Sequence, residues 1–448
     1  NINYMNQVTR GEFNDGYANQ SSGAFNQWFH RNLDVKLLKQ FRNLKTPEGI
    51  LASWNHKNPE SYSASNPLQF YGGNYWYNLY SFFDNINNTN NRDRLFGFIA
   101  LQYKITNDLT VRATYRKQQL TTFYENKVYT ILETSATQTG VKAGYATGET
   151  YSNRENFEGL LTYTKKIKDF SINANLGFDI FRSTYKDIRA NTNNGLNVPD
   201  FFDLANSKNP ISYDNRREKN KYRAGFVRGD LGYKNLVFVE FALRQDYFST
   251  LPVDDNGIFS KSFGLSFVFS DLIKQDLPWL SFGKLRASWG EVPQAINPYV
   301  LGFNYAVATN QWDGNFIMNT PDRLVDPKIS GSVTTQREIG VDLRFVNNRI
   351  GISATYWDGT VKDIPLDINI NGASGFTRKL VNAGEISKKG IDLQFNAIPL
   401  RSREFEWQIF ATWGRLLENE VVKLAPGLDR ITFSSGTFAG SYAAYVVN

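Results

Sequence analysis

Residues 171–180 read Ser-Ile-Asn-Ala-Asn-Leu-Gly-Phe-Asp-Ile, a regular alternation of apolar and polar positions. In an extended chain successive side chains point to opposite faces, so this segment has one apolar and one polar face. The apolar face holds Ile172, Ala174, Leu176, Phe178 and Ile180, and the polar face holds Ser171, Asn173, Asn175 and Asp179. The pattern predicts a β-strand that lies between an apolar environment and water.

Roughly a dozen segments share this pattern. They are residues 94–104, 109–118, 156–165, 170–185, 221–233, 236–247, 260–270, 280–290, 334–346, 349–361, 389–397 and 405–415. Short turns alternate with long polar connections at 119–155, 186–220, 291–333 and 362–388. Outer-membrane barrels combine short periplasmic turns with long outer loops, whereas β-sandwiches and propellers have more even spacing. The sequence therefore predicts an all-β fold, a transmembrane antiparallel β-barrel with long extracellular loops.

Composition supports this fold class and excludes several functions. Of 448 residues, 41% are hydrophobic and 15% aromatic, yet no apolar run approaches the ~20 residues of a membrane helix. The mean hydropathy of −0.44 suits a barrel because only alternate strand residues touch lipid. The chain has no cysteine, which excludes disulfides, thiol nucleophiles and cysteine-ligated metals. Its net charge of +7 is spread among acids, so we expect no nucleic-acid partner.

Charged residues on the polar strand faces need a wet environment, because a Lys or Arg at the lipid midplane costs about 2–4 kcal/mol. We therefore predict that a wide lumen contains Glu240, Arg244, Arg286, Asp342 and Arg344. An unclosed sheet in lipid leaves edge N–H and C=O groups unpaired, at several kcal/mol each. Either the strands close on themselves or further strands lie outside this sequence, and we favour the second.

The long loops hold the candidate ligand contacts. Residues 1–93 are read mainly as a long extracellular loop, with one helical patch at about 33–43. Flat aromatic faces bind sugar rings or apolar peptide side chains, but they also pack loop on loop. The candidates for ligand binding are Tyr71, Tyr75, Trp76, Tyr77 and Trp312. Aromatic residues on strands are expected to face lipid or its interface, and they are Tyr356, Trp357, Trp407 and Trp413.

Enzyme chemistry has no support in the sequence. It contains no nucleophile elbow, phosphate loop or zinc motif. Its two histidines, His30 and His56, have no metal-ligand partner at a useful spacing. We expect no catalytic residue, no metal and no cofactor.

Several motifs occur in the order found in one family. Residues 335–342 read Thr-Gln-Arg-Glu-Ile-Gly-Val-Asp, and residues 382–393 read Asn-Ala-Gly-Glu-Ile-Ser-Lys-Lys-Gly-Ile-Asp-Leu. Phe405-Glu406-Trp407 and Glu418-Asn419-Glu420-Val421 follow, and Lys284–Gly290 precedes them. Together they resemble the SusC/RagA family of TonB-linked outer-membrane transporters of Bacteroidetes, over nearly the whole chain.

The resemblance implies a fragment of the middle-to-late part of a barrel of about 22 strands. Residues 94–424 would supply strands and loops, and residues 425–448 would lead into C-terminal strands outside the sequence. The family's signal peptide, TonB box and plug domain are absent here, so we expect them in a missing N-terminal region. The location implied is the bacterial outer membrane, with lipid around the barrel.

The resemblance also implies the activity and the partners. The intact protein would import oligosaccharides or peptides, energised by the TonB complex, with a SusD-like surface lipoprotein as a lid. Two alternatives stay open: a SusC-like barrel that is a structural subunit of a larger outer-membrane assembly, and a soluble glycan-binding β-protein. The sequence does not distinguish a glycan from a peptide substrate.

Overall fold

The computed structural model describes residues 2–11, 34–52, 60, 62–66, 77–135, 141–273, 275–423, 430–434 and 441–445. Most of its regular structure is β-strand, as predicted. None of the helices among these residues has the length and apolar character to cross a membrane. The chain divides into two compact units, of which the first comprises residues 1–98, 116–155 and 183–219, and the second residues 99–115, 156–182 and 220–448.

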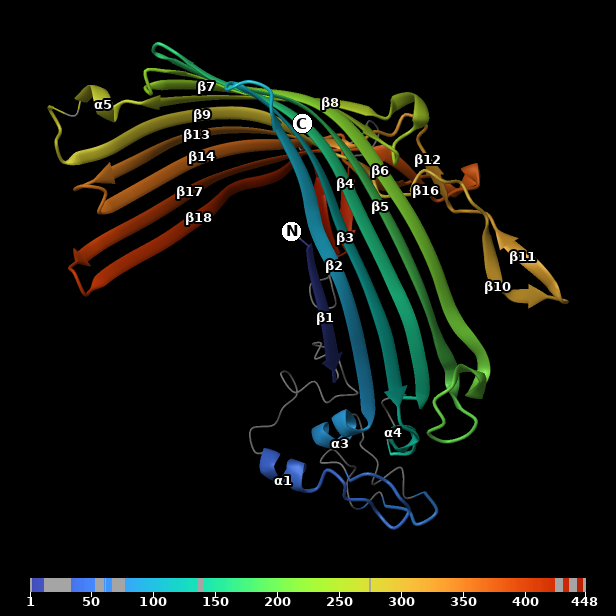
Figure 1. Ribbon diagram of the computed structural model, residues 1–448. Helices are drawn as coiled ribbons and strands as arrows, with labels where there is room; N and C mark the ends of the chain where they lie inside the picture. The colour runs from blue at the N-terminus through green and yellow to red at the C-terminus, as the bar shows by residue number, and fades with distance from the viewer. Residues whose placement is uncertain are drawn as a thin grey trace. The chain divides into compact units, whose positions relative to one another are not determined.

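One sheet contains 13 strands, in the order β1-β2-β3-β4-β5-β6-β7-β8-β9-β13-β14-β17-β18. The strands are β1 (Ile2–Arg10), β2 (Ile86–Lys104), β3 (Leu109–Val128), β4 (Gly144–Ile167), β5 (Phe170–Leu196), β6 (Ser207–Tyr233), β7 (Val237–Phe248), β8 (Gly257–Val268), β9 (Leu280–Gln294), β13 (Ser332–Phe345), β14 (Ile350–Lys362), β17 (Glu385–Arg401) and β18 (Glu406–Lys423). Within the second unit, β7 to β18 lie side by side (Figure 1). Their pairing is antiparallel throughout, which agrees with the predicted fold class.

The strands extend well beyond the predicted segments. β3, β4, β5 and β6 run into the regions 119–155 and 186–220, which the sequence led us to assign to loops. β1 was not predicted at all, although it pairs along its whole length with β2. These extensions are rich in Asn, Thr and Lys, so the apolar–polar alternation stops while the backbone hydrogen bonding continues. A strand with polar side chains on both faces has no period-two signal.

Short turns join the predicted hairpins. The turn between β6 and β7 has Lys234 and Asn235 at φ 51° and 58°, and the turn between β13 and β14 has Asn347 and Asn348 at φ 54° and 63°. Two consecutive residues of positive φ match the twist of a two-residue hairpin, and Asn tolerates this backbone better than most residues. The turn residues thus fix the register of the strands that they join.

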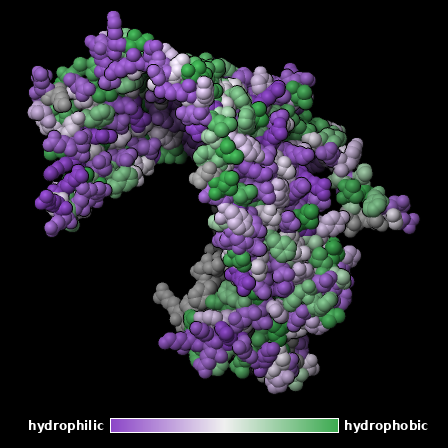
Figure 2. Space-filling model, viewed as in Figure 1, coloured by the Kyte–Doolittle hydropathy of each residue, from purple (hydrophilic) through white to green (hydrophobic). Residues whose placement is uncertain are grey.

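The register assigns the side chains of the paired strands β7, β8, β9 and β13 to one of two faces. On the first, Glu240 pairs through Gly264 and Ser288 with Glu338, so we call this the polar face. On the second, Val239 pairs through Leu265 and Ala287 with Ile339, and we call this the apolar face. Leu265 is 52% exposed and Ile339 is 61% exposed. Figure 2 shows such hydrophobic residues, in green, at the molecular surface. Uncovered apolar side chains on successive strands require a hydrocarbon environment.

A row of charges marks one limit of the apolar face. Arg337 of β13 pairs with Asp358 of β14, which pairs with Lys389 of β17. Lys389 in turn donates to Glu418 of β18 at 2.7 Å. Between this row and the short turns, the strands have apolar runs. In β13 the run comprises the alternate positions from Ile339 to Phe345. A charged border beside an apolar band is expected at the interface between lipid and water.

The first unit contains a small core outside the sheet. Leu51, Tyr77, Phe82 and Leu132 are buried together, near the helices α1 (Val35–Gln40), α3 (Leu79–Asp84) and α4 (Thr130–Thr134). The predicted helical patch at 33–43 corresponds to α1, whose N-cap is Asp34. The Asp34 side chain accepts from the backbone N–H of Lys36 at 2.8 Å, which satisfies a donor that the helix leaves open.

A charge cluster ties α4 to the strands that follow. The Glu133 carboxylate accepts from the Ala143 N–H at 2.9 Å and lies 3.2 Å from the ammonium of Lys142 and 3.7 Å from that of Lys208. Burial raises the pKa of Glu133, but the Ala143 N–H and the two ammonium groups outweigh burial and bring that pKa below its ordinary value. The charged Glu133 carboxylate therefore holds α4 to the segments that contain Lys142, Ala143 and Lys208.

The regions 291–333 and 362–388, predicted as loops, contain small sheets in the second unit. β12 (Arg323–Val325), β16 (Arg378–Asn382) and β15 (Pro365–Asn369) form a three-stranded sheet, which we call the loop sheet. The hairpin of β10 (Ala306–Trp312) and β11 (Asn315–Asn319) pairs only with itself. β19 (Arg430–Ser434) and β20 (Ser441–Tyr445) form another hairpin in the predicted C-terminal connection.

The loop sheet joins two connections that are distant in sequence. β12 is parallel to β16, and Asp322 accepts from the backbone N–H of Thr377 at 2.7 Å. The carboxylate of Asp326 lies 3.2 Å from the ammonium of Lys379. The backbone N–H of Lys328 and the Lys379 ammonium lower the pKa of Asp326. The loop sheet therefore links the two predicted loops 291–333 and 362–388. No local sequence pattern indicated this pairing.

Candidate functional site

All five predicted lumen residues lie on the polar face. Register places Glu240 and Arg244 there on β7, Arg286 on β9, and Asp342 and Arg344 on β13. The predicted charge environment is therefore a shared surface of adjacent strands. The five residues differ in their neighbours. Some are held by ion pairs within the protein, and others are less constrained.

Arg286 is the centre of an ionic cluster. Its Nη1 lies 3.6 Å from Oε2 of Glu338, and its Nε lies 3.6 Å from Oδ2 of Asp342. It also donates to Oγ1 of Thr355. The side chain crosses over Gly340, where an added Cβ would lie 2.8 Å from the guanidinium carbon. Gly340 is thus required by the path of Arg286 across β13.

Arg244 is held by a second cluster. Its Nε lies 2.9 Å from Asp246, and its Nη2 lies 3.3 Å from Asp179. The Tyr222 hydroxyl donates to Asp179 at 3.0 Å, and the Phe226 ring lies 5.8 Å from the guanidinium carbon. A charge with two carboxylates and an aromatic neighbour is already satisfied by the protein. Arg244 therefore stabilises the wall rather than offering a free cation.

Arg344 lies in a smaller groove of about 340 Å³. Its guanidinium carbon is 5.2 Å from the centre of the Phe282 ring, and Asp342, at the same groove, accepts from the Ser353 hydroxyl at 2.5 Å. Lys284, Gln394 and Asn396 also line this groove. The groove therefore has a mixed polar and apolar lining.

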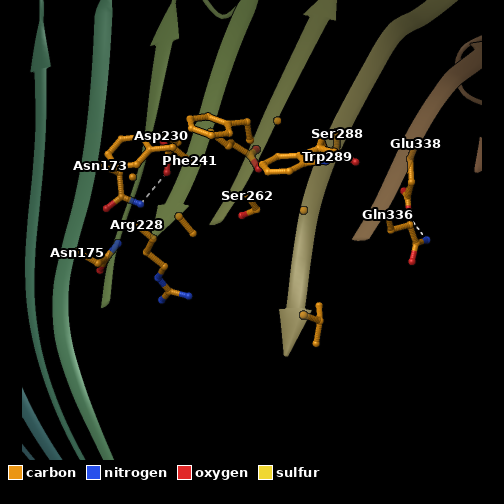
Figure 3. Close-up of a pocket in the computed structure, with 17 residues that line it drawn as sticks. Asn173, Asn175, Arg228, Asp230, Phe241, Ser262, Ser288, Trp289, Gln336 and Glu338 are labelled. Carbon is orange, nitrogen blue, oxygen red and sulfur yellow. Dashed lines mark hydrogen bonds between the residues drawn. The ribbon is translucent and has the colours of Figure 1, made fainter. Parts of the chain in front are cut away.

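A larger depression, which we call the wall groove, has a volume of about 590 Å³. Its polar and small side chains come from β5 to β13: Asn173, Asn175, Arg228, Asp230, Glu240, Ala242, Ser262, Gly264, Ser288, Gly290, Gln336 and Glu338. Figure 3 shows Arg228 with Asn173 and Asp230 at one side, Gln336 and Glu338 at the other, and Ser262 between them. Of these residues, the sequence analysis had named Glu240 as a site residue. The others come from strands separated by up to four intervening strands, so no local sequence pattern groups them.

Hydrogen bonds fix two carboxylates of the wall groove. Asn173 donates to Asp230 at 3.0 Å, and Gln336 donates to Glu338 at 2.8 Å. Phe241, Phe263 and Trp289 are also among the residues that line the groove, although the register assigns their side chains to the apolar face, where the ring centroids of Phe263 and Trp289 are 6.2 Å apart. The groove thus offers charges and hydrogen-bonding groups.

The aromatic candidates have separate outcomes. Tyr71, Tyr75 and Trp76 lie outside the described residues. Tyr77 is 2% exposed, and its hydroxyl donates to the Leu132 carbonyl at 2.5 Å. Tyr77 therefore has the packing role that the sequence left open, and it is not positioned for ligand contact.

Trp312, in contrast, is 76% exposed at the end of β10. Among the strand aromatics, Trp357 corrects our expectation of a lipid-facing side chain. It pairs with Glu338 on the polar face, and its ring covers Gly390. Tyr356 is its chain neighbour and lies on the apolar face, because adjacent strand residues cannot share a face.

The described residues include no group of three or more His, Cys, Asp or Glu arranged to hold a metal ion. The polar face presents charged and hydrogen-bonding side chains.

Comparison with known proteins identifies the family. The sequence profile described as "TonB dependent receptor-like, beta-barrel" matches residues 4–445. The chain belongs to this TonB-dependent receptor family. The bilayer around its apolar face is therefore the outer membrane, and the predicted fold class and SusC/RagA resemblance are confirmed at this level.

Two receptors of Formosa agariphila are similar to this TonB-dependent receptor chain. TonB-dependent receptor P3 is 23% identical over 64% of this chain and 29% of its own length. TonB-dependent receptor P39 is 23% identical over 77% of this chain and 32% of its own length. The chain thus spans less than a third of these two relatives.

Solved structures share the fold. The structure of the RagAB peptide transporter superposes with a TM-score of 0.68 and 18% identity, over 81% of this chain and 40% of that chain. The RagAB peptide importer in its "open-open" state gives a TM-score of 0.67, again at 18% identity, over 81% of this chain and 39% of that one. These two structures and the present chain therefore share a fold.

Proposed function

We propose that the full protein imports oligosaccharides or peptides across the outer membrane. The observation that supports this most directly is the division of the sheet into a charged polar face and an exposed apolar face. A wall of this kind separates hydrocarbon from water and can line an aqueous path. The lumen-facing polar residues either contact the solute on this path or hold a plug domain.

Energy and a partner complete the proposal. Binding in a lumen becomes net import only if an energy source changes the site, and in this family the proposed source is TonB. The proposed partner is a SusD-like lipoprotein, which would cover the outer opening. RagAB, which shares the barrel fold, is a peptide transporter, and this likeness supports by analogy both a partner and a peptide substrate. Trp312, exposed on its hairpin, is the proposed aromatic contact for ligand.

Uptake by whole cells tests the proposal. Cells with the full-length gene, cells without it and complemented cells are given fluorescent peptides and fluorescent oligosaccharides, each with and without a protonophore. We expect accumulation of one class that depends on both the gene and the proton-motive force. Equal accumulation without the gene, together with co-purification of a stable envelope assembly, contradicts import and favours a structural subunit.

A further inference from the structure

We propose that the lipid-facing surface of the barrel wall holds a binding site for a phosphorylated lipid headgroup. The site consists of three basic residues of the second unit, Arg182 of β5 and Lys221 and Arg223 of β6, which we call the basic cluster. The inference concerns contact between the wall and the bilayer, so it does not depend on the proposed import function.

The β6 part of the basic cluster lies on the apolar face. Arg223 is the register partner of Tyr247 on β7, and Tyr247 shares a strand face with Val239 because the two are an even number of residues apart. Lys221 is two residues from Arg223 and has the same orientation. In the sequence, every second residue from 217 to 223 is basic. The side of β6 that meets lipid further along the strand is therefore cationic here.

Arg182 of β5 lies beside Lys221. On the polar face the ring of Phe181 stacks on that of Tyr222, with centroids 5.1 Å apart. Arg182 follows Phe181 and Lys221 precedes Tyr222, so these two basic residues are neighbours across the strands on the opposite, apolar face. Three cations are thus grouped on two adjacent strands.

The positive charge of the basic cluster is not neutralised by the protein. All three side chains are exposed, and none of the described residues forms an ion pair with them. The Arg223 guanidinium lies 5.2 Å from the centre of the Tyr247 ring, a contact that orients the side chain and leaves its charge. Like charges on neighbouring strand positions repel each other. An anion between them removes this repulsion and accepts charge-assisted hydrogen bonds.

The position of the basic cluster along β6 corresponds to the outer leaflet. β6 ends at Tyr233, next to the short turn of Lys234 and Asn235, and short turns of outer-membrane barrels are periplasmic. Ten residue steps separate Tyr233 from Arg223. At about 3.3 Å per step they span roughly 33 Å along the strand, or roughly 25 Å across the membrane at a tilt of about 40°. The apolar band of such barrels is about 25 Å tall, so Arg223 lies where the outer headgroups begin.

The surface on the membrane side of the basic cluster suits acyl chains. Gly225 and Val227 follow Arg223 in alternate positions of β6, and the side chains of Val227 and of Phe178 on β5 are exposed. A Cβ added to Gly225 would meet no atom within 4 Å, so the wall is open directly beside Arg223. One lipid molecule can therefore place its phosphate on the basic cluster and its acyl chains along the apolar surface. An acidic protein would match the charge but not the apolar part of this surface.

Binding to the delipidated full-length protein in detergent tests the inference. Native mass spectrometry gives the affinity for lipid A with two phosphates and for the same lipid A after enzymatic removal of both phosphates. We expect the phosphorylated form to bind at least about tenfold more tightly, and inorganic phosphate at equal concentration to leave it bound. Equal affinities of the two lipids overturn the inference, and displacement by inorganic phosphate overturns a lipid as the ligand.

Three variants locate the site. Lys221→Gln and Arg223→Gln each remove one cation and should weaken binding of phosphorylated lipid A about tenfold, without changing the affinity for the dephosphorylated form. The matched control is Arg228→Gln, which removes a cation from the polar face of the same strand and should leave both affinities unchanged. Retention of the folded, heat-modifiable form on gels shows that each variant is intact.

The variants also separate a lipid from a protein ligand. Unchanged lipid affinity in both Lys221→Gln and Arg223→Gln, or an equal loss in Arg228→Gln, overturns the basic cluster as the site. A change in the oligomeric state of the lipid-free variants, with lipid affinity unaltered, assigns the basic cluster to a contact between proteins and likewise overturns the inference.

Discussion

Replacing Leu393 by arginine places a charge on the apolar face of β17, whereas the same replacement at Gln394 places it on the polar face. The two residues are neighbours in one strand, and their register partners are Ala354 and Ser353. Leu393 is 41% exposed and lies within the apolar run that begins after Lys389. The two substitutions therefore differ in the face of the sheet that receives the arginine and in little else.

The expected costs follow from the surroundings. An arginine on the lipid face costs about 2–4 kcal/mol near the bilayer midplane, whereas an exposed polar substitution usually changes stability by less than about 0.5 kcal/mol. Leu393→Arg should thus lower the folding equilibrium constant by a factor of roughly 30 to 1,000, and Gln394→Arg should scarcely change it. Full-length protein in phosphatidylcholine vesicles is titrated with guanidinium chloride and followed by tryptophan fluorescence. A Gln394→Arg cost equal to or above that of Leu393→Arg would refute the assignment of faces.

Three further changes test the described contacts. Arg286→Met leaves the Glu338 carboxylate without its guanidinium and should destabilise the protein by about 1–2 kcal/mol; a double-mutant cycle with Glu338→Gln should show coupling, and simple additivity would contradict the ion pair. Because the pKa of Glu133 is lowered on folding, its stabilisation is complete above the unfolded pKa and is lost as pH falls through the lower folded pKa. Amide exchange of residues 130–135 and 141–143, normalised to intrinsic rates, should therefore accelerate in acid, and Glu133→Gln should abolish that dependence; an identical acid response in the variant counts against a stabilising role for the Glu133 carboxylate. Tyr77→Phe removes a buried hydrogen bond and should cost about 1–2 kcal/mol in local protection without altering uptake; unchanged protection together with impaired uptake would restore a ligand role.

Sequence patterning identified the parts of the fold that lie between two environments. The alternation in residues 334–346 and 349–361 predicted β13 and β14 within a few residues, because one face of each meets hydrocarbon and the other meets water. The distal half of β5 has polar residues on both faces, and in β1 the alternation of Ile2, Tyr4 and Val8 with polar residues is interrupted at Met5 and Asn6. Their positions depend on partner strands rather than on local pattern, so the sequence did not reveal them.

The candidate site could also be predicted only in part from the sequence. Glu240 and Arg286 were predictable as wet residues because a charge among apolar neighbours excludes the lipid face. Their partners were not predictable, since Gly340 and Thr355 contact Arg286 only through strand pairing. For Tyr77 the sequence left loop packing and ligand contact open, and the burial of its side chain with Leu132 could be read only from the structure.

Nitroxide labels on single cysteines test the central division into faces most directly. The sequence has no native cysteine, so residues 338–344 of the full-length protein can be labelled one at a time, after removal of any cysteine elsewhere in the polypeptide. In bilayers we expect collisions with oxygen, which dissolves in lipid, to be most frequent at Ile339, Val341 and Leu343. Collisions with a water-soluble nickel chelate should peak at Glu338 and Asp342. Opposite phases for the two quenchers, or no alternation at all, would contradict a wall with lipid on one side and water on the other.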